Sequence, residues 1–329
     1  MLALRRPKLT TDLLRAENLS KSYPVGQGIQ NKSKRILAVN QVYLAVQTGE
    51  TLGLVGESGC GKSTLGKLLV GLESASKGKI FYENKQIWTK RTPNFELRQK
   101  IQMIFQDPFS SLNPRQKIKN IIAEGLLVRS KKKKLRQNIN EQVSRIMHKT
   151  GLLAEYGNRY PHEFSGGQRQ RIAIARVLAM NPSVVICDEP VSALDVSIQA
   201  QIVNLLRQMQ EEMHISMLFI SHDLSVISNI CHSVAVMYLG SILETGRRAA
   251  IYSRPAHPYT QALLKAVPSA DPEKKTEYLL LQGEPPSPLN PPGGCPFHTR
   301  CPQCMPQCRE KKPGWTEVTP KHYVRCFLH

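Results

Sequence analysis

The residues with the clearest chemical meaning form a glycine-rich run between an apolar stretch and a predicted helix. The run from 56 to 64, Gly-Glu-Ser-Gly-Cys-Gly-Lys-Ser-Thr, fits the pattern G-x-x-x-x-G-K-S/T. Glycines let backbone N–H groups converge on phosphate oxygens, and a helix N-terminus adds a favourable potential for an anion. The run therefore predicts a nucleotide site in which Lys62 reaches the β- and γ-phosphates and the Ser63 hydroxyl binds Mg²⁺. The expected nucleotide contacts are Gly56, Glu57, Ser58, Gly59, Cys60, Gly61, Lys62, Ser63 and Thr64.

Two acidic residues end a second apolar run. Val184-Val-Ile-Cys187 is followed directly by Asp188 and Glu189. An acid pair after a strand is by itself usually only a solvated strand end. Beside a phosphate-binding loop it predicts that Asp188 holds Mg²⁺ through water and that Glu189 orients or deprotonates the attacking water.

Short apolar runs alternate with longer amphipathic stretches along the chain. We expect strands at 51–56, 101–105, 184–187 and 217–220, and helices at 65–71 and 198–213. This alternation predicts an α/β fold with a largely parallel, covered sheet. Residues 118–151 look helical throughout and interrupt the alternation, so we expect an inserted helical subdomain at about 107–163.

A further motif carries a resemblance to a known family. Phe164-Ser-Gly-Gly-Gln-Arg-Gln-Arg171 resembles the signature motif of ABC ATPases and precedes Asp188 in that family's order. The resemblance implies an ABC-type P-loop fold: a RecA-like core with a mostly parallel sheet, an antiparallel β subdomain and a helical subdomain. It also implies that two ATP molecules are sandwiched between two such ATPases. The signature residues expected to face the partner's ATP are Ser165, Gly166, Gly167 and Gln168.

Other positions of the family also match. Gln106 resembles the Q-loop residue that senses Mg²⁺ and the γ-phosphate, and His222 resembles the switch histidine. Tyr23 resembles the aromatic residue that stacks on adenine. The D-loop at the dimer interface corresponds to Ser192, Ala193, Leu194 and Asp195. The resemblance thus implies Glu189, His222 and Gln106 as catalytic residues, with Mg²⁺ held through Ser63, Gln106 and Asp188.

The resemblance covers nearly the whole chain, from about Leu14. Segments 105–114, 187–201 and 257–264 are similar to the F-type ATP-binding subunits of bacterial oligopeptide and dipeptide importers. That implies ATP and Mg²⁺ as cofactors, and ATP hydrolysis coupled to peptide uptake at the cytoplasmic face of the bacterial cytoplasmic membrane. The implied partners are a second, paralogous ATPase subunit, two transmembrane permease subunits and an extracytoplasmic substrate-binding protein. Nickel and glutathione importers share this plan and stay open as alternatives.

The C-terminal part is set off by a Pro-rich linker at 284–294. We expect an ATPase domain at 12–266 and an oligopeptide/dipeptide-transporter extension at 267–329. The family's 4Fe–4S ligands correspond to Cys295, Cys301, Cys308 and Cys326. A Cys₄ zinc site stays open, because thiolates suit both groups and Cys304 adds another thiol. We expect the cluster to be a structural clip and not a redox centre, so that replacing Cys308 loosens the tail and leaves ATP binding intact.

The composition is that of a folded protein with a strong positive charge. Hydrophobic residues make up 41% of the 329 residues, and 45 Lys and Arg stand against 25 Asp and Glu, a net charge of +20. Such a charge, with the run Lys131 to Lys134, superficially favours an ABC ATPase that acts on nucleic acid or ribosomes. Those proteins usually carry two cassettes or a long coiled coil, and neither is visible, so no nucleic-acid partner is expected. No secretory signal and no run of about 18 apolar residues is visible, which predicts a cytosolic chain that reaches the membrane through partners.

Overall fold

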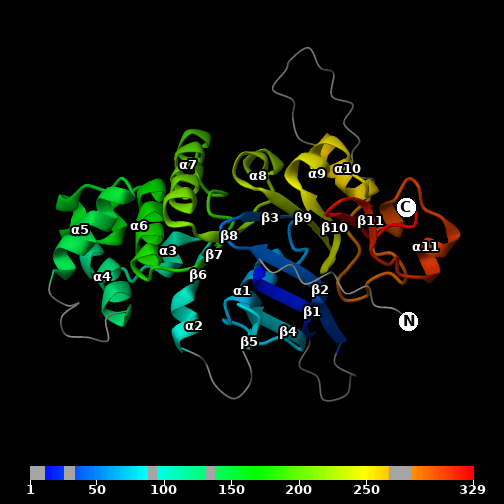
Figure 1. The fold of residues 1–329 in the computed structure, drawn as a ribbon, viewed down its shortest axis with the longest axis horizontal. Helices are drawn as coiled ribbons and strands as arrows, with labels where there is room; N and C mark the ends of the chain where they lie inside the picture. Colours follow the sequence, from blue (N-terminus) through cyan, green and yellow to red (C-terminus); the bar gives the residue numbers. More distant parts are fainter. Residues whose placement is uncertain (1–11, 26–33, 88–94, 130–137, 267–282) are drawn as a thin grey trace, which may run out of the picture. The chain divides into compact units, whose positions relative to one another are not determined.

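The computed structural model describes residues 12–25, 34–87, 95–129, 138–266 and 283–329. These residues divide into two compact units (Figure 1). Unit 1 contains the described parts of 1–47, 51–87 and 221–329, and unit 2 contains those of 48–50 and 88–220. The phosphate-binding loop lies in unit 1, whereas Asp188 and the signature motif lie in unit 2.

Unit 1 contains an antiparallel sheet in the order β2-β1-β4-β5. Its strands are β1 (Asp12–Val25), β2 (Lys34–Gln47), β4 (Lys77–Tyr82) and β5 (Lys85–Ile87). Buried and half-buried positions alternate at the start of β1, where Leu14 and Ala16 are buried, as expected for a sheet with one face on the core. This sheet is the antiparallel β subdomain that the family resemblance predicts.

The second run of strands in unit 1 has the order β11-β12-β10-β9-β3. Its members are β3 (Thr51–Val55), β9 (Ser233–Tyr238), β10 (Ser241–Arg247), β11 (Thr316–Thr319) and β12 (His322–Val324). β3 and β9 are parallel, and the other neighbours are antiparallel. The accompanying helices are α1 (Lys62–Leu69), α8 (Leu224–Ile230), α9 (Arg248–Ser253), α10 (Pro258–Lys265) and α11 (Pro306–Glu310). The C-terminal segment, of which residues 283–329 are described, thus adds two strands to the sheet, β11 and β12. The sequence did not indicate these strands.

Unit 2 contains three parallel strands in the order β8-β7-β6. They are β6 (Ile101–Ile104), β7 (Val184–Asp188) and β8 (Ser216–Ile220), each within a residue of its expected bounds. Every residue of β7 and β8 is buried, which explains their runs of four apolar residues, Val184 to Cys187 and Met217 to Ile220. The flanking helices are α2 (Phe95–Lys100), α3 (Pro108–Ser111), α6 (Gly166–Ala179) and α7 (Val196–Met213).

A helical cluster in unit 2 has an apolar core of its own. It contains α4 (Ile118–Arg129), α5 (Ile139–Lys149), the 3₁₀ turns η2 (Ala154–Asn158) and η3 (Pro161–Glu163), and part of α6. Ile118, Ile122 and Ile172 in this core are fully buried. Lys131 to Lys134 fall at 130–137, outside the described residues, so the continuous helix expected at 118–151 is described only as α4 and α5. No helix in the described ranges has the length and apolar character needed to span a bilayer.

Candidate nucleotide site

The phosphate-binding loop connects β3 to α1 and leaves no room for side chains at two of its glycines. A Cβ atom on Gly56 would lie 2.1 Å from the carbonyl oxygen of Met237. A Cβ on Gly61 would lie 2.1 Å from the carbonyl oxygen of Ala38, and the φ of Gly61 is 107°, which favours glycine. Packing therefore requires glycine at both positions.

Lys62 is the first residue of α1, and its side chain turns back into the loop. Its Nζ atom donates hydrogen bonds to the carbonyl oxygens of Gly56 (2.8 Å) and Glu57 (3.0 Å), and the residue is 4% exposed. The ammonium group thus lies inside the curve of the loop, where the pattern predicts phosphate. Burial raises the pKa of the neighbouring Cys60 thiol, so this side chain fills space in its protonated form.

Tyr23 lies on β1 beside the N-terminal end of α1. Its hydroxyl donates to the Glu73 carboxylate and also hydrogen-bonds to the Thr64 side chain. Burial, and to a smaller extent the neighbouring Glu73 carboxylate, raises the pKa of Tyr23 to about 12. The Lys21 ammonium lies 4.9 Å from the centre of the Tyr23 ring. Tyr23 is thus held close to the loop, while its stacking on adenine stays a prediction.

His222 follows β8 in sequence and lies between two residues with fixed contacts in unit 1. The Ser221 N–H donates to the carbonyl oxygen of Leu54 in β3 (3.2 Å). The Asp223 N–H donates to Ser221 Oγ (2.9 Å), and Asp223 in turn caps α8 through its carboxylate. The exposed His222 side chain therefore leaves the backbone next to the strand that leads into the phosphate-binding loop.

In unit 2, the two acids at the end of β7 have different surroundings. Asp188 is the last residue of the strand and is 4% exposed. Glu189 has a φ of 45°, in the left-handed region, and its N–H donates to the carbonyl oxygen of Ile220 (3.0 Å). Such a backbone in a non-glycine residue costs about 1–3 kcal/mol, and strain of this kind concentrates at functional sites.

The structure brings Gln106 and Glu189 together. Gln106 Nε2 donates to Glu189 Oε2 at 3.2 Å, although 83 positions separate the two residues. Gln106 follows β6, and β6 is the parallel neighbour of β7. Adjacent parallel strands end at the same edge of a sheet, which explains how the sequence positions both side chains there.

The signature motif is arranged as a helix N-terminus. Ser165 Oγ accepts a hydrogen bond from the N–H of Gln168 (3.3 Å), and Gln168 Oε1 accepts one from the N–H of Ser165 (3.0 Å). This capping box orients the first turn of α6, and Ser165 and Gly166 are exposed there. A Cβ on Gly167 would lie 2.5 Å from Cγ2 of Ile198, so α7 packs directly on the motif.

The D-loop leads from Glu189 into α7. Ser192 Oγ donates to the carbonyl oxygen of Glu189 (3.1 Å), which ties this loop to the acid pair. Ala193 and Asp195 are exposed, and Val196 at the start of α7 is 81% exposed. The exposed Val196 side chain gives the start of α7 an apolar surface position next to the D-loop.

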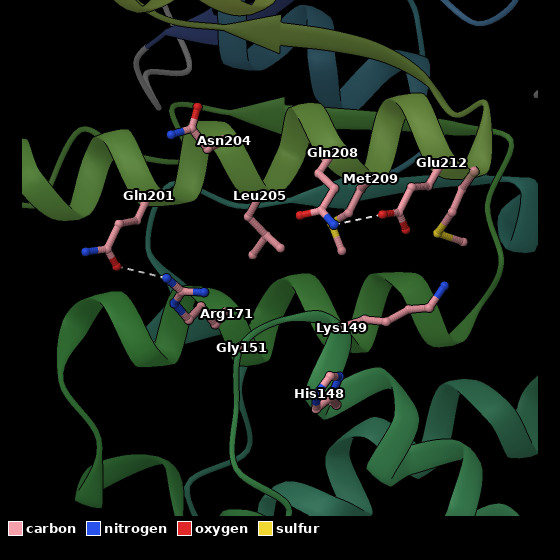
Figure 2. Close-up of a pocket in the computed structure, with 11 residues that line it drawn as sticks. His148, Lys149, Gly151, Arg171, Gln201, Asn204, Leu205, Gln208, Met209 and Glu212 are labelled. Atoms are coloured by element: carbon pink, nitrogen blue, oxygen red, sulfur yellow. Dashed lines mark hydrogen bonds between the residues drawn. The ribbon is translucent and has the colours of Figure 1, made fainter.

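A pocket of about 630 Å³ lies between α5, α6 and α7 (Figure 2). Arg171 Nη2 donates to Gln201 Oε1 across it at 2.9 Å. The sequence-predicted nucleotide residues are not among those that line it. The pocket is therefore separate from the site that the motifs define.

The C-terminal cysteines lie close to one another in unit 1. The Cys295 N–H donates to the carbonyl oxygen of Cys308 (2.8 Å), and both residues are 7% exposed. Burial, with a smaller contribution from the thiols of Cys308, Cys326 and Cys301, raises the pKa of Cys295 to about 11. No described cysteine forms a disulfide, and the described residues hold no set of three or more His, Cys, Asp or Glu side chains in a ready-made metal-binding arrangement.

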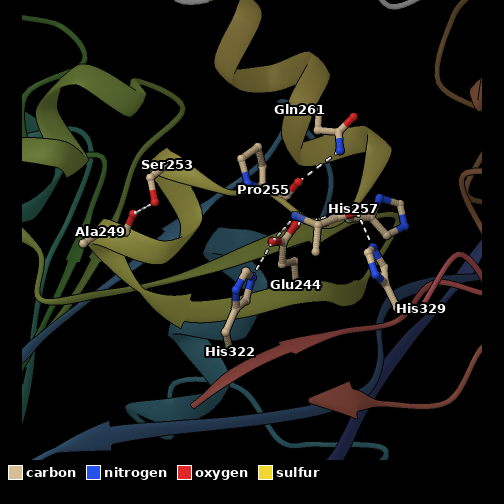
Figure 3. A network of polar contacts seen from close by, with 9 residues as sticks. Glu244, Ala249, Ser253, Pro255, His257, Gln261, His322 and His329 are labelled. Carbon is tan, nitrogen blue, oxygen red and sulfur yellow. Dashed lines mark hydrogen bonds and ion pairs between the residues drawn. The ribbon is translucent and has the colours of Figure 1, made fainter. Parts of the chain in front are cut away.

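Buried polar contacts join the C-terminal segment to β10 (Figure 3). The fully buried Glu244 accepts hydrogen bonds from the backbone N–H groups of Ala256 (2.8 Å) and His257 (2.9 Å). Glu244 Oε1 also lies 2.7 Å from His322 Nε2 on β12. Burial alone would raise the pKa of Glu244, but the hydrogen bonds from His322 and from the two backbone N–H groups lower it overall. The segment is thus part of the folded unit and not an appended tail.

Sequence reasoning missed one contact of the phosphate-binding loop. The Arg300 guanidinium donates to both carboxylate oxygens of Glu57, with Nη1–Oε2 at 2.8 Å and Nη2–Oε1 at 3.0 Å. These residues lie 243 positions apart, so no local pattern could have indicated the pair. The C-terminal extension therefore contacts the phosphate-binding loop, whereas the effect of Cys308 on ATP binding stays a prediction.

Comparisons with known proteins agree with this architecture. The family model described as "ABC transporter" matches residues 39–192, and that described as "Oligopeptide/dipeptide transporter, C-terminal region" matches residues 243–308. The chain is 50% identical over 322 residues to the oligopeptide transport ATP-binding protein OppF of Salmonella typhimurium, covering 96% of each chain. It is 47% identical over 321 residues to the dipeptide transport ATP-binding protein DppF of Haemophilus influenzae, covering 97% of this chain and 98% of the relative.

A solved structure supports the fold as well. It is a dimeric, post-hydrolysis state of the ATP-binding cassette MJ0796 bound to ADP and Pi. The TM-score is 0.61 at 26% sequence identity, covering 71% of this chain and 98% of that one. The fold and the motifs define a P-loop ATPase. More particularly, this chain belongs to the ABC transporter family, whose ATPases bind and hydrolyse ATP.

Proposed function

We propose that this chain is the ATP-hydrolysing subunit of an importer of oligopeptides or dipeptides. The observation that carries this proposal is the likeness to OppF and DppF over nearly the whole chain, including the C-terminal region. The alternatives, import of nickel or glutathione or an action on nucleic acid, have no comparable support. We also propose an ATPase domain at 12–266, with a helical subdomain at about 107–163, and an extension at 267–329.

In the proposed mechanism, unit 1 holds the nucleotide. Tyr23 stacks on adenine, and Lys62 exchanges its bonds to the loop carbonyls for the β- and γ-phosphates. Ser63, Gln106 and Asp188 would hold Mg²⁺, which supplies positive charge to the phosphates when bound. The oxygen-rich donors and the buried carboxylate of Asp188 fit a hard cation. His222 contacts the γ-phosphate from the segment after β8.

Hydrolysis is proposed to need Glu189 and a second ATPase. Glu189 orients or deprotonates the attacking water, and its bond from Gln106 holds the carboxylate in place. The exposed N-terminus of α6, with Ser165 and Gly166, would bind the γ-phosphate held by the other subunit. The dimeric state of the cassette MJ0796 supports this pairing. The second subunit in our proposal is a paralogue of this chain.

We further propose that two permease subunits dock on unit 2, close to the segment that follows Gln106. Phe109 in α3 is 49% exposed, and Leu127 and Val128 in α4 are each 41% exposed, which supplies apolar contact area. The chain would then lie on the cytoplasmic face of the cytoplasmic membrane, with an extracytoplasmic binding protein delivering the peptide.

The peptide assignment can be tested by uptake of a labelled dipeptide or oligopeptide in cells with this chain as the sole copy. Lys62→Ala should abolish uptake, because the phosphates lose their main side-chain cation. Lys79→Ala, which removes an exposed lysine on β4, is the matched control and should leave uptake unchanged. Equal uptake with Lys62→Ala and the unaltered chain would disprove the peptide assignment.

For the cysteines, we propose that Cys295, Cys301, Cys308 and Cys326 hold a 4Fe–4S cluster, with zinc as the alternative. Burial, with a smaller effect of the neighbouring thiols, raises the pKa values of Cys295, Cys301 and Cys326. This proximity, together with the hydrogen bond from the Cys295 N–H to the Cys308 carbonyl oxygen, supports the proposal. Thiolate donors suit both groups, and ligation would need some rearrangement of the side chains. A bound cluster would supply cross-links between parts of the segment.

Metal analysis of chain purified without oxygen tests this site. We expect about four iron atoms and four acid-labile sulfides per chain, with both reduced by Cys308→Ser. Cys187→Ser, at a buried cysteine of β7 in unit 2, is the control. One zinc per chain without sulfide would support the alternative, and neither metal would refute both.

A further inference from the structure

Arg300 stands out because it contacts the phosphate-binding loop from the cysteine-containing segment. Its guanidinium forms a two-pronged pair with the Glu57 carboxylate, at 2.8 and 3.0 Å. The Arg300 side chain is only 5% exposed, and that of Glu57 is 24% exposed. Paired hydrogen bonds of this geometry fix both position and orientation, which a single contact from lysine would not do.

The position of Arg300 is determined by an aromatic cluster. Phe297, which is fully buried, packs against the rings of Tyr238 and Tyr259 with ring centres 5.4 and 5.2 Å apart. A 3₁₀ turn, His298–Arg300, then leads from Phe297 to the arginine. The Arg300 Nη1 atom also lies 3.4 Å from the Tyr238 hydroxyl. The guanidinium is therefore held before any nucleotide binds.

Glu57 is held at three points. Its N–H donates to the Tyr259 hydroxyl (3.0 Å), its carbonyl accepts from Lys62 Nζ (3.0 Å), and its carboxylate accepts from Arg300. Two of these three partners come from the part of the chain after β10. The conformation of the loop at its second residue thus depends on distant C-terminal residues.

The charge of Glu57 makes the pair relevant to nucleotide binding. A carboxylate in a loop that receives a polyphosphate repels the ligand, and at close range in a partly buried site this repulsion is poorly screened. The guanidinium of Arg300 neutralises that charge, and its two hydrogen bonds hold the Glu57 carboxylate against Arg300. Removal of Arg300 would leave the carboxylate unpaired beside the phosphates.

We propose that Arg300 is a positioning residue for the phosphate-binding loop. It fixes the loop through Glu57 and masks a carboxylate that would otherwise oppose ATP, so that nucleotide affinity depends on the C-terminal segment. The inference builds on the proposed assignment of this loop as the ATP site.

The test is calorimetric titration of the full-length chain with MgATP, together with steady-state hydrolysis. Arg300→Ala should raise the Kd and the KM for MgATP about tenfold, the effect of an interaction change near 1.4 kcal/mol. The kcat should stay within about twofold, because the groups proposed for chemistry lie elsewhere. Arg309→Ala, at an exposed arginine of the same segment, should bind as the unaltered chain does.

A second substitution separates charge masking from a general structural role. Glu57→Gln removes the charge but keeps the side-chain shape, and by itself should weaken binding less than Arg300→Ala does. Combined with Arg300→Ala, it should restore the Kd to within about threefold of that of the unaltered chain. If Arg300→Ala does not fold, Arg300→Lys replaces it in the test. Arg300→Lys should raise the Kd for MgATP about threefold, and adding Glu57→Gln should bring the Kd back toward that of the unaltered chain.

The outcomes are distinct. An unchanged Kd in the folded Arg300 variant would overturn the inference, as would a double variant that binds no better than the single one. If neither the unaltered chain nor Lys62→Ala bound MgATP, the assignment of the loop as the ATP site would be wrong, and the role proposed for Arg300 would be excluded as well.

Discussion

At the scale of single residues, Glu189 has both a left-handed backbone and a carboxylate held by a hydrogen bond. Its backbone is in the left-handed region, with φ at 45°, and its carboxylate is held by Gln106 at 3.2 Å. The strained backbone turns the chain sharply as it leaves β7. A carboxylate fixed in this way needs little reorganisation before it can act on a water molecule.

Glu189→Gln should slow ATP hydrolysis by roughly 10²–10⁴, the usual contribution of a positioned base, while MgATP still binds. The amide keeps the size of the side chain but cannot accept a proton. Turnover of the assembled complex and MgATP titration measure the two effects separately. Glu211→Gln on the exposed side of α7 is the control, and an unaltered rate in Glu189→Gln would exclude the proposed role.

The sequence indicates these residues but not their contacts. The motif around Lys62 and the acids after β7 are local patterns, and the structure has the strand ends and helix starts that the patterns predict. The bond from Gln106 to Glu189 and the pair of Arg300 with Glu57 join distant positions. Their geometry depends on packing of the whole unit, which no local pattern records.

At the scale of elements, the loop before α10 contains a buried histidine. His257 Nδ1 accepts a hydrogen bond from the Tyr259 N–H (3.0 Å), and His257 is 1% exposed. Burial lowers the pKa of His257 to about 4, with Glu244 opposing and His329 adding to that effect. The side chain is therefore neutral in the folded protein at neutral pH.

Stability should fall as the pH drops below 6.5. The unfolded chain gains a proton on His257 near pH 6.5, whereas the folded chain does so only near pH 4. Between pH 7 and 5 the free energy of unfolding should therefore decrease by about 2 kcal/mol from this residue. Glu244 has a lowered pKa, so it adds a further loss only at more acidic pH, below its ordinary value of 4.5.

Urea denaturation at a series of pH values measures this dependence. His257→Asn keeps a side chain that can cap α10 but cannot take a proton, so its stability should vary less between pH 7 and 5. His162→Asn, at an exposed histidine of η3, should follow the unaltered chain. Parallel curves for His257→Asn and the unaltered chain would contradict the prediction.

The buried strands were the elements that the sequence predicted best. β7 and β8 are almost entirely apolar, with Asp188 and Ser216 as the only polar residues, because both faces are covered, and their limits agree with the apolar runs to within a residue. The short strands β11 and β12 were missed. Their residues include polar groups, such as Glu317 on β11 and His322 on β12, whose burial or exposure depends on the pairing of β11 with β12 and of β12 with β10.

At the scale of the whole molecule, the proposed pairing with another ATPase can be tested through the exposed signature motif. The Glu189→Gln variant should hydrolyse MgATP slowly and therefore stay in the ATP-bound state. In light scattering with MgATP, its mass should shift from that of a monomer to that of a dimer, either when the variant is measured alone or when a paralogous ATPase is added. Adding Gly166→Glu should prevent the shift, because a carboxylate would face the partner's γ-phosphate. The Cβ position of Gly166 lies 3.4 Å from Leu194, so the chain tolerates a side chain there. No dimer in either mixture would contradict the pairing.

The strand pairing of the C-terminal segment has a consequence for solubility. β10 pairs with β9 on one side and with β12 on the other, through Glu244 with Val324 and Thr245 with Tyr323. Without β12, β10 would present a row of unsatisfied N–H and C=O groups, a template on which strands of other chains can add. The outermost strand, β11, is only four residues long and carries a charged side chain, Glu317, which makes it a poor template. A chain shortened before β11 would therefore be prone to aggregate through its sheet, so the segment also protects the protein against self-association.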